Sequence, residues 1–180
     1  MTEKELIQAL KNNDSEAFKY VYEQYYNKIK HLCYGIVNNP EDAEDLAQEV
    51  FIDLYNSISR FRGDSKLSTW IHRIALNKSY TFVQKKKFKN IFTKLEEKLT
   101  QQADKVEDED LKTKQINDLH KAIKALPARQ AKAFTLFYYE GIPQKEIVEI
   151  MELESVSAVE QLIFRAKQKI KQTMSLNEDE

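Results

Sequence analysis

Glycine and proline are scarce in this sequence, with three of each among 180 residues. Few positions can therefore interrupt a helix or form the tight turns that join short strands. Hydrophobic residues make up 42% of the chain, and Lys, Glu and Leu, which favour helices, are common. The composition predicts an all-α protein.

Cysteine is almost absent, since Cys33 is the only one. A single cysteine excludes an internal disulfide and is typical of a reducing cytosol. We interpret Cys33 as buried filler because it falls on the apolar face of a predicted helix. No hydrophobic run approaches the ~20 residues of a membrane span, and the amino terminus lacks the features of a signal peptide. We expect a cytoplasmic protein without membrane insertion.

Histidines and glycines are too few and too scattered for familiar catalytic sites. His31, His72 and His120 lie far apart in sequence and show no metal-ligand spacing with Cys33. Three glycines do not supply a glycine-rich phosphate loop. We therefore expect no enzymatic activity, no cofactor or metal and no small-molecule substrate.

The net charge of −1 conceals a strong segregation of charge. Six acids and no Lys or Arg occur from Glu41 to Asp53, whereas nine bases and one acid occur from Arg60 to Lys89. The first segment offers an acidic helix to a protein partner, although a solvated helix face explains it equally well on charge alone. The second offers cations and aromatic rings, which suit phosphates and unstacked bases.

Four helices are predicted in the first part of the chain. Thr2 and Glu5 form a capping box before a short helix, and Asp14 can cap the next one. Asn39 and Pro40 suit the start of a third helix over about 40–58. A loop follows, and then a fourth helix over about 67–88. Its single tryptophan fits the core or a stacking surface for a base, and the core is the simpler interpretation.

The second part of the chain indicates a helix-turn-helix. Polar residues 93–110, rich in acids, are interpreted as a flexible linker. Apolar spacing then predicts helices over 111–126, 128–140, 144–151 and 156–173, the last two joined by Glu152–Ser155. A short helix, a tight turn and a longer helix with a basic second half fit this DNA-binding motif.

Several motifs, taken in order, carry a resemblance. They are Asp42–Phe51 (DAEDLAQEVF), Phe61–Ser65 (FRGDS), Trp70–Ala75 (WIHRIA) with Asn77, Leu126–Gln130 (LPARQ), Tyr139–Gly141, Glu146–Ile147, Ser157–Glu160 and Arg165–Lys167. Together they resemble the sigma factors of bacterial RNA polymerase, in the extracytoplasmic-function (ECF) group of the sigma-70 family. The match covers nearly the whole chain with the right spacing.

The resemblance implies two small helical domains joined by the linker. Residues 1–92 correspond to sigma region 2, 93–110 to the linker, 111–174 to region 4 and 175–180 to a polar tail. The implied partners are core RNA polymerase, promoter DNA and an anti-sigma factor. In this scheme the helix-turn-helix reads the −35 element, and region 2 melts and reads the −10 element.

The resemblance also implies site residues. Core-polymerase binding falls to Asp45, Gln48 and Glu49. Contacts to −10 DNA fall to Phe61, Arg62, Lys66, Trp70, Arg73, Asn77, Lys85 and Lys86. Contacts to −35 DNA fall to Ser155, Ser157, Ala158, Glu160, Gln161, Arg165 and Lys167.

The sequence departs from the family pattern at a few of these surfaces. Leu76, Thr81 and Gln84 stand where relatives usually carry Arg, Asp and Arg. Glu154 lengthens the turn of the helix-turn-helix by one residue. Two alternatives stay open at this point. One is a two-domain helix-turn-helix regulator that never touches the polymerase, and the other is a sigma-like decoy without initiation activity.

Overall fold

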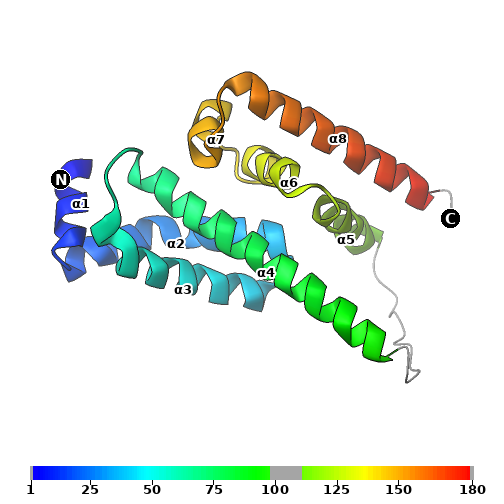
Figure 1. The fold of residues 1–180 in the computed structure, drawn as a ribbon, viewed down its shortest axis with the longest axis horizontal. Coiled ribbons are helices and arrows are strands. Elements are labelled where there is room, and N and C mark those ends of the chain that lie inside the picture. The colour runs from blue at the N-terminus through cyan, green and yellow to red at the C-terminus, as the bar shows by residue number, and fades with distance from the viewer. Residues whose placement is uncertain (1, 98–110, 179–180) are drawn as a thin grey trace.

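A computed structural model describes residues 2–97 and 111–178 of the protein. Every regular element in these ranges is helical, as the composition predicts (Figure 1). The elements are α1 (Glu3–Lys11), α2 (Ser15–Val37), α3 (Pro40–Ser57), η1 (Ile58–Arg60), α4 (Leu67–Glu97), α5 (Leu111–Lys124), α6 (Ala128–Phe134), η2 (Thr135–Tyr139), α7 (Gln144–Met151) and α8 (Val156–Glu178).

The predicted helix starts are confirmed by their capping contacts. Thr2 Oγ1 accepts from the Glu5 N–H at 3.3 Å, and the Glu5 carboxylate accepts from the Thr2 N–H at 2.7 Å. Asp14 caps α2, and Asn39 caps α3 with Pro40 in its first turn. Such caps satisfy backbone N–H groups that a helix start leaves without partners.

Helices α1 to α4 form an N-terminal bundle in which α2, α3 and α4 pack against one another. Their apolar stripes meet in a core of fully buried aliphatic side chains, among them Val21, Ile29, Leu32, Val50, Leu54 and Ile71. Each such side chain contributes about 1.5–3 kcal/mol when it leaves water. Helix α1 covers one end, where the Glu3 carboxylate accepts from the Leu67 N–H at 2.8 Å and so caps α4.

Helix α4 is longer than predicted. The sequence predicts an end near Phe88, but the helix continues to Glu97, inside the segment assigned to the linker. No glycine or proline occurs between Leu67 and Leu126, so no local backbone feature ends the helix at Phe88. The rest of the linker assignment, residues 98–110, lies outside the described residues.

Helices α5 to α8 form a C-terminal unit in which α5, α6 and α7 all pack against α8. The helix predicted over 128–140 is not uniform. An α-helical part ends at Phe134, and Thr135–Tyr139 form a π-helical turn. Gly141 follows with a φ of +65°, a conformation that glycine adopts without strain. The last helix continues past the predicted end at residue 173 to Glu178.

The two units share a hydrophobic core. Leu136, Ile147 and Val159 of the C-terminal unit belong to the same buried cluster as the core of the N-terminal bundle. Contacts between α4 and α7, and between α2 and η2, join the units (Figure 1). The sequence predicted two linked domains but gave no indication that they pack against each other.

Cys33 is fully buried, as predicted, and accepts a hydrogen bond from Ser79 Oγ at 3.3 Å. Burial raises the pKa of its thiol to about 11, which makes it a poor nucleophile. Within the described ranges, no helix has both the length and the hydrophobicity that a membrane crossing requires.

Neighbouring positions on α3 provide a test of this packing. Leu54 is fully buried, whereas Ile52 is 57% exposed. Leu54→Ala should lower the free energy of unfolding by about 2–5 kcal/mol, because the cavity it leaves refills only partly. Ile52→Ala, the matched control, should change it by less than about 0.5 kcal/mol. Urea denaturation followed by circular dichroism measures both, and equal losses would contradict this assignment of the core.

Candidate protein and nucleic-acid interfaces

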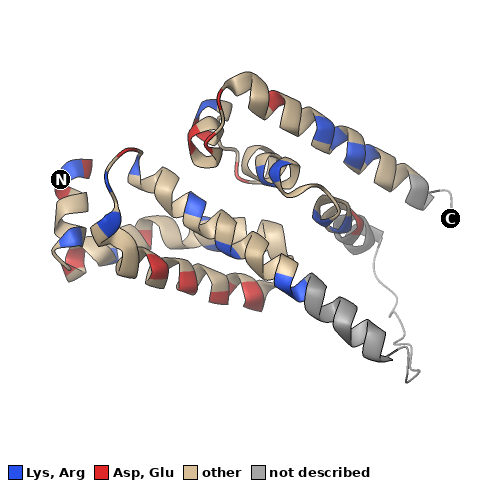
Figure 2. Cartoon of the chain, viewed as in Figure 1, with Lys and Arg blue, Asp and Glu red and all other residues tan. Residues whose placement is uncertain are grey.

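The acidic helix α3 has two polar faces with different surroundings. Acidic positions recur along the length of α3, on one side of the N-terminal bundle (Figure 2). One group of acids faces α4: Lys86 Nζ lies 2.7 Å from Asp42, and Lys78 Nζ lies 2.8 Å from Glu49 and 2.9 Å from Asp53. These acids are neutralised inside the chain.

The second face of α3 points away from α4. Glu41, Asp45, Gln48, Ile52 and Tyr55 follow one another at helical spacings of three and four and are all exposed. We call these five residues the outer stripe. Asp45 and Gln48 have no ion pair or side-chain hydrogen bond within the described part of the chain.

The structure therefore divides the predicted polymerase-binding set. Asp45 and Gln48 lie on the outer stripe, while Glu49 lies on the flank beside Lys78. Ile52 and Tyr55, at 57% and 49% exposure, complete the stripe with apolar surface that sequence reasoning missed. Their spacing from Gln48, four and seven residues, was the available indication.

The loop before α4 holds the first of the predicted −10 contacts. Phe61 stacks on Trp70 with ring centroids 4.8 Å apart, and only 6% of Phe61 is exposed. Arg62 and Gly63 are exposed beyond this pair, and Gly63 has a φ of +82°. The aromatic pair thus forms a packed support, while the tip of the loop, where Arg62 Nε lies 3.6 Å from the Asp64 carboxylate, stays open to solvent.

Three predicted −10 residues, on α4 or just before it, contact the C-terminal unit. Arg73 donates to the backbone carbonyls of Glu149 and Ile150 and pairs with Glu152 at 2.8 Å. Asn77 accepts from Lys132 Nζ at 3.0 Å. Lys66 Nζ lies 3.9 Å from the Glu146 carboxylate.

The far end of the basic surface lies beside α3. Lys86 pairs with Asp42 and also lies 5.5 Å from the ring centroid of Phe82. Lys85 is exposed and lines a shallow groove with Asn77 and Lys78. Burial acts against the charge of Lys78, but hydrogen bonds to Glu49 and Asp53 outweigh it and raise its pKa.

The predicted helix-turn-helix is present as α7, a turn and α8. Glu152 ends α7 with a φ of +52°, and Ser155 Oγ caps α8 by accepting from the Ala158 N–H at 3.3 Å. One side of α8 is buried against the rest of the C-terminal unit, through Val159, Ile163, Ala166 and Ile170. Ser157, Glu160, Gln161 and Arg165 are exposed on the other side, and Ala158 is partly buried.

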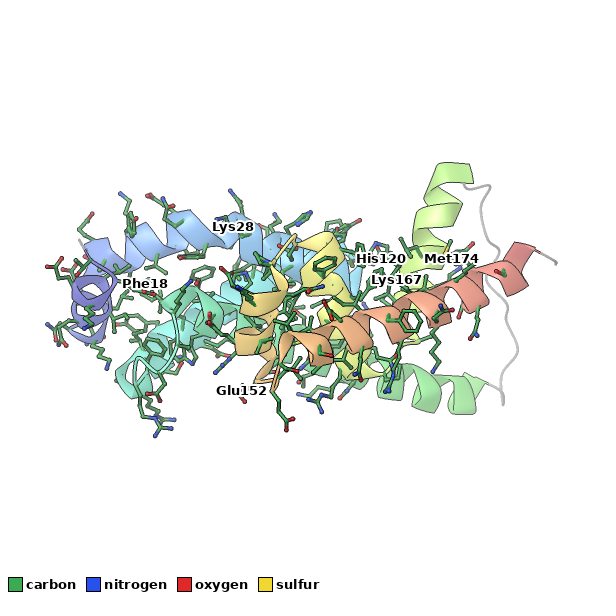
Figure 3. The ribbon with its side chains drawn as sticks, turned by 90° about the horizontal axis from the view of Figure 1, so that it is seen from above. Phe18, Lys28, His120, Glu152, Lys167 and Met174 are labelled. Atoms are coloured by element: carbon green, nitrogen blue, oxygen red, sulfur yellow. The ribbon has the colours of Figure 1, made fainter. Side chains whose placement is uncertain are left out.

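Two exposed residues on α8 have surroundings that the sequence did not indicate. Lys167 lies 5.6 Å from the ring centroid of Tyr138, so it is held toward α6 and η2 (Figure 3). Phe164, which was not predicted as a site residue, is 62% exposed between Glu160, Gln161 and Arg165.

Comparison with known proteins matches both units. The family model for Sigma-70 region 2 matches residues 21–89, and that for Sigma-70, region 4 matches residues 116–170. Bundle and helix-turn-helix thus define a transcription initiation factor of the sigma-70 type.

Bacterial relatives are similar along nearly the whole chain. The ECF RNA polymerase sigma factor SigW of Bacillus subtilis is 31% identical over 180 residues, 95% of this chain and 96% of the relative. The ECF RNA polymerase sigma-E factor of Haemophilus influenzae is 32% identical over 184 residues, 94% of each. The chain belongs to the ECF group of the sigma-70 family, and it is an alternative sigma factor that directs promoter-specific transcription initiation.

Solved structures share the fold. CnrH in complex with the cytosolic domain of CnrY has a TM-score of 0.68 at 18% identity and covers 97% of both chains. The sigma factor RpoE of Bartonella quintana, in complex with the anti-sigma factor NepR, has a TM-score of 0.60 at 17% identity, covering 88% of this chain and 96% of that one. The family models and the relatives favour neither alternative left open by the sequence, a helix-turn-helix regulator that never touches the polymerase or a sigma-like decoy without initiation activity.

The bridge between α3 and α4 yields a stability prediction. Lys78→Met leaves Glu49 and Asp53 without their shared cation and should lower the free energy of unfolding by at most about 1 kcal/mol, because the pair is partly exposed. The loss should shrink in 1 M NaCl, where charges are screened. Lys85→Met is the matched control, and urea titrations at low and high salt measure both. A loss that persists in high salt would mean that the Lys78 side chain acts through packing.

Proposed function

We propose that this sigma factor binds core RNA polymerase through the outer stripe of α3. The observation that supports this is the free carboxylate of Asp45 and free amide of Gln48 beside the apolar side chains of Ile52 and Tyr55. A mixed surface of this kind, with an apolar centre and polar neighbours, suits a helical protein partner. Glu49 and Asp42 act mainly within the chain, where they hold Lys78 and Lys86.

In this proposal the −10 element meets α4 and the loop before it. Arg62, Lys66, Arg73 and Lys85 supply charge for phosphates, and Asn77 supplies an amide for a base edge. Phe61 and Trp70 support the loop by stacking on each other. The partly buried ring of Trp70 offers a stacking surface for a base taken out of the duplex. Proteins commonly bind single strands by stacking unpaired bases on aromatic side chains.

The −35 element meets the exposed side of α8. The first turns of a recognition helix enter the major groove, where Gln161 can read an adenine and Glu160 can accept from a cytosine amino group. Arg165 lies one turn later and is suited to a phosphate or a guanine. The acid at position 160 also repels phosphate, so it lowers the affinity of α8 for any duplex in which it accepts no hydrogen bond from a base.

The partners and setting of the protein follow the same scheme. One structural neighbour, RpoE of Bartonella quintana, is a sigma factor in complex with an anti-sigma factor, NepR, which supports the proposal of such an inhibitor here. We propose that the chain works in the cytoplasm and performs no catalysis itself. Strand opening is then driven by binding energy within the polymerase complex.

Run-off transcription with core RNA polymerase tests the α3 assignment. Asp45→Ala combined with Gln48→Ala should weaken polymerase binding by roughly tenfold to a hundredfold, because each residue loses an interface contact. Glu23→Ala with Gln24→Ala is the matched control, since this acid and amide are equally exposed on α2. Transcripts that persist unchanged in the α3 double variant would exclude the outer stripe as the binding surface. Polymerase binding without any new transcript would instead favour a decoy.

Salt titration of DNA binding tests the α8 assignment. Arg165→Ala should weaken binding to a −35 duplex and reduce the slope of log affinity against log salt by about one, as expected for one lost phosphate contact. Gln161→Ala should leave the slope unchanged but reduce discrimination between sequences. Fluorescence anisotropy with selected and scrambled duplexes measures both effects. A slope unaltered by Arg165→Ala would show that this side of α8 does not face the DNA backbone.

A further inference from the structure

The loop between η1 and α4 carries proposed −10 contacts, and both of its ends meet α1. Helix α1 lies at the end of the N-terminal bundle where α3 gives way to α4 (Figure 1). It packs against η1, which leads into the loop at Phe61. It also reaches the first residue of α4, because the Glu3 carboxylate accepts from the Leu67 N–H at 2.8 Å. One short helix therefore contacts the chain just before the loop and just after it.

The start of α4 cannot be capped by the residue at its own N-cap position. The Lys66 carbonyl accepts from the Trp70 N–H at 3.1 Å, the first bond of the helix, which places Lys66 at the N-cap. A lysine side chain has only donors, so it cannot accept from the N–H groups that a helix start leaves unpaired. The Ser65 hydroxyl donates to the Lys66 carbonyl, and the first turn carries no acid. Glu3, 64 positions upstream, supplies the missing acceptor and negative charge.

Trp70 connects this first turn to the loop. Because its N–H closes the turn, the position of its ring follows from where α4 begins. The ring stacks on Phe61 with an interplanar angle of 27°. Phe61 in turn follows η1 directly, and its N–H donates to the Ile58 carbonyl at 3.0 Å. Helix α1 thus holds both members of the aromatic pair, one through η1 and the other through the first turn of α4.

Helix α1 is itself anchored to the bundle. Leu10 is buried, and Leu6 and Ile7 pack against the same core. The capping box at its start closes its first turn. On the neighbouring helix α2, burial raises the pKa of the Tyr25 phenol, and the nearby Glu3 carboxylate adds to the rise. Glu3 is therefore presented to α4 by a helix whose place in the fold is fixed by packing.

We propose that α1 positions the −10 loop and that Glu3 is the positioning residue through which it does so. The inference rests on the proposed function of the loop and gives Glu3 no contact with DNA. With Glu3 in place, Phe61 and Trp70 stay stacked, and the exposed Arg62 keeps a fixed place beside them. Without it, the first turn of α4 frays, and DNA binding must then provide the order that the loop has lost.

The fluorescence of Trp70 measures this positioning directly, because the chain contains no other tryptophan. Glu3→Ala should increase the quenching of this fluorescence by acrylamide, since a frayed first turn exposes the ring. Glu3→Gln keeps an oxygen that can accept from the Leu67 N–H but loses the charge, so its quenching should lie between the two. Glu23→Ala removes another exposed carboxylate, on α2, and is the matched control without any expected change.

A local cap tests whether the contact with α4 is the cause. Lys66→Ser places a good N-cap residue at the start of α4. In the Glu3→Ala background it should return the quenching of Trp70 to the wild-type level. A role of Glu3 within α1 or beside Tyr25 would not be repaired from position 66. Quenching that stays high in this double variant would therefore overturn the inference.

DNA binding is measured with the complex of the full chain and core RNA polymerase. Glu3→Ala should bind a single-stranded −10 oligonucleotide about threefold to fivefold more weakly than the wild type, the factor that corresponds to one lost helix cap. Affinity for a −35 duplex and for the polymerase should not change, because α8 and the outer stripe of α3 lie on other elements. Glu23→Ala is again the control, and fluorescence anisotropy of labelled probes gives the affinities.

Failure of this inference differs from failure of the proposed function. If the wild type binds the −10 strand and Glu3→Ala binds it equally well, α1 does not position the loop for DNA. Equal weakening of both DNA probes would also overturn the inference, because it would reflect general destabilisation. If the wild-type complex binds the −10 strand no better than a scrambled strand, while the quenching of Trp70 follows the expected order, the assignment of the loop to −10 DNA is wrong.

Discussion

Helix α4 must satisfy three neighbours at once, and the rest of the structure depends on how it does so. Its apolar side, with Ile71 and Ala75, is buried in the bundle core. Lys78 and Lys86 hold the acids of α3. Arg73 holds the end of α7. Because a helix presents every third or fourth residue to the same side, Lys78 follows Ile71 and Ala75 on the side that meets the bundle, whereas Arg73 lies on another side.

Because the side of α4 that meets α3 differs from the side that carries Arg73, the proposed polymerase and promoter surfaces lie apart in one short protein. The pairing of Glu49 and Asp42 with α4 keeps the two helices in register and leaves the outer stripe free for a partner. Lys78 and Lys86 pair with acids of α3, and Arg62 and Lys85 are exposed. The shared core and the contact of Arg73 with Glu152 place the C-terminal unit against the side of α4 that carries proposed −10 residues.

Much of the fold could be predicted from local patterns. The caps at Thr2, Asp14 and Asn39 fixed three helix starts, since these contacts involve residues two or three positions apart. The end of α4 and the π-helical turn at Thr135–Tyr139 could not be predicted. No breaking residue marks the first, and the second depends on how η2 packs against α2 and α7.

For the candidate sites, the sequence predicted which types of residue are present, and the tertiary structure decided which of them pair. The amino-acid sequence by itself determined the helical class, the two-part organisation, the acidic and basic segments and the family they resemble, because composition, spacing and charge are local properties. Only the tertiary structure decided that Glu49 faces Lys78 while Asp45 faces solvent, and that Arg73 is held by α7. Those pairings join residues 29 and 77 positions apart, so they exist only once helices pack and bring distant charges within reach.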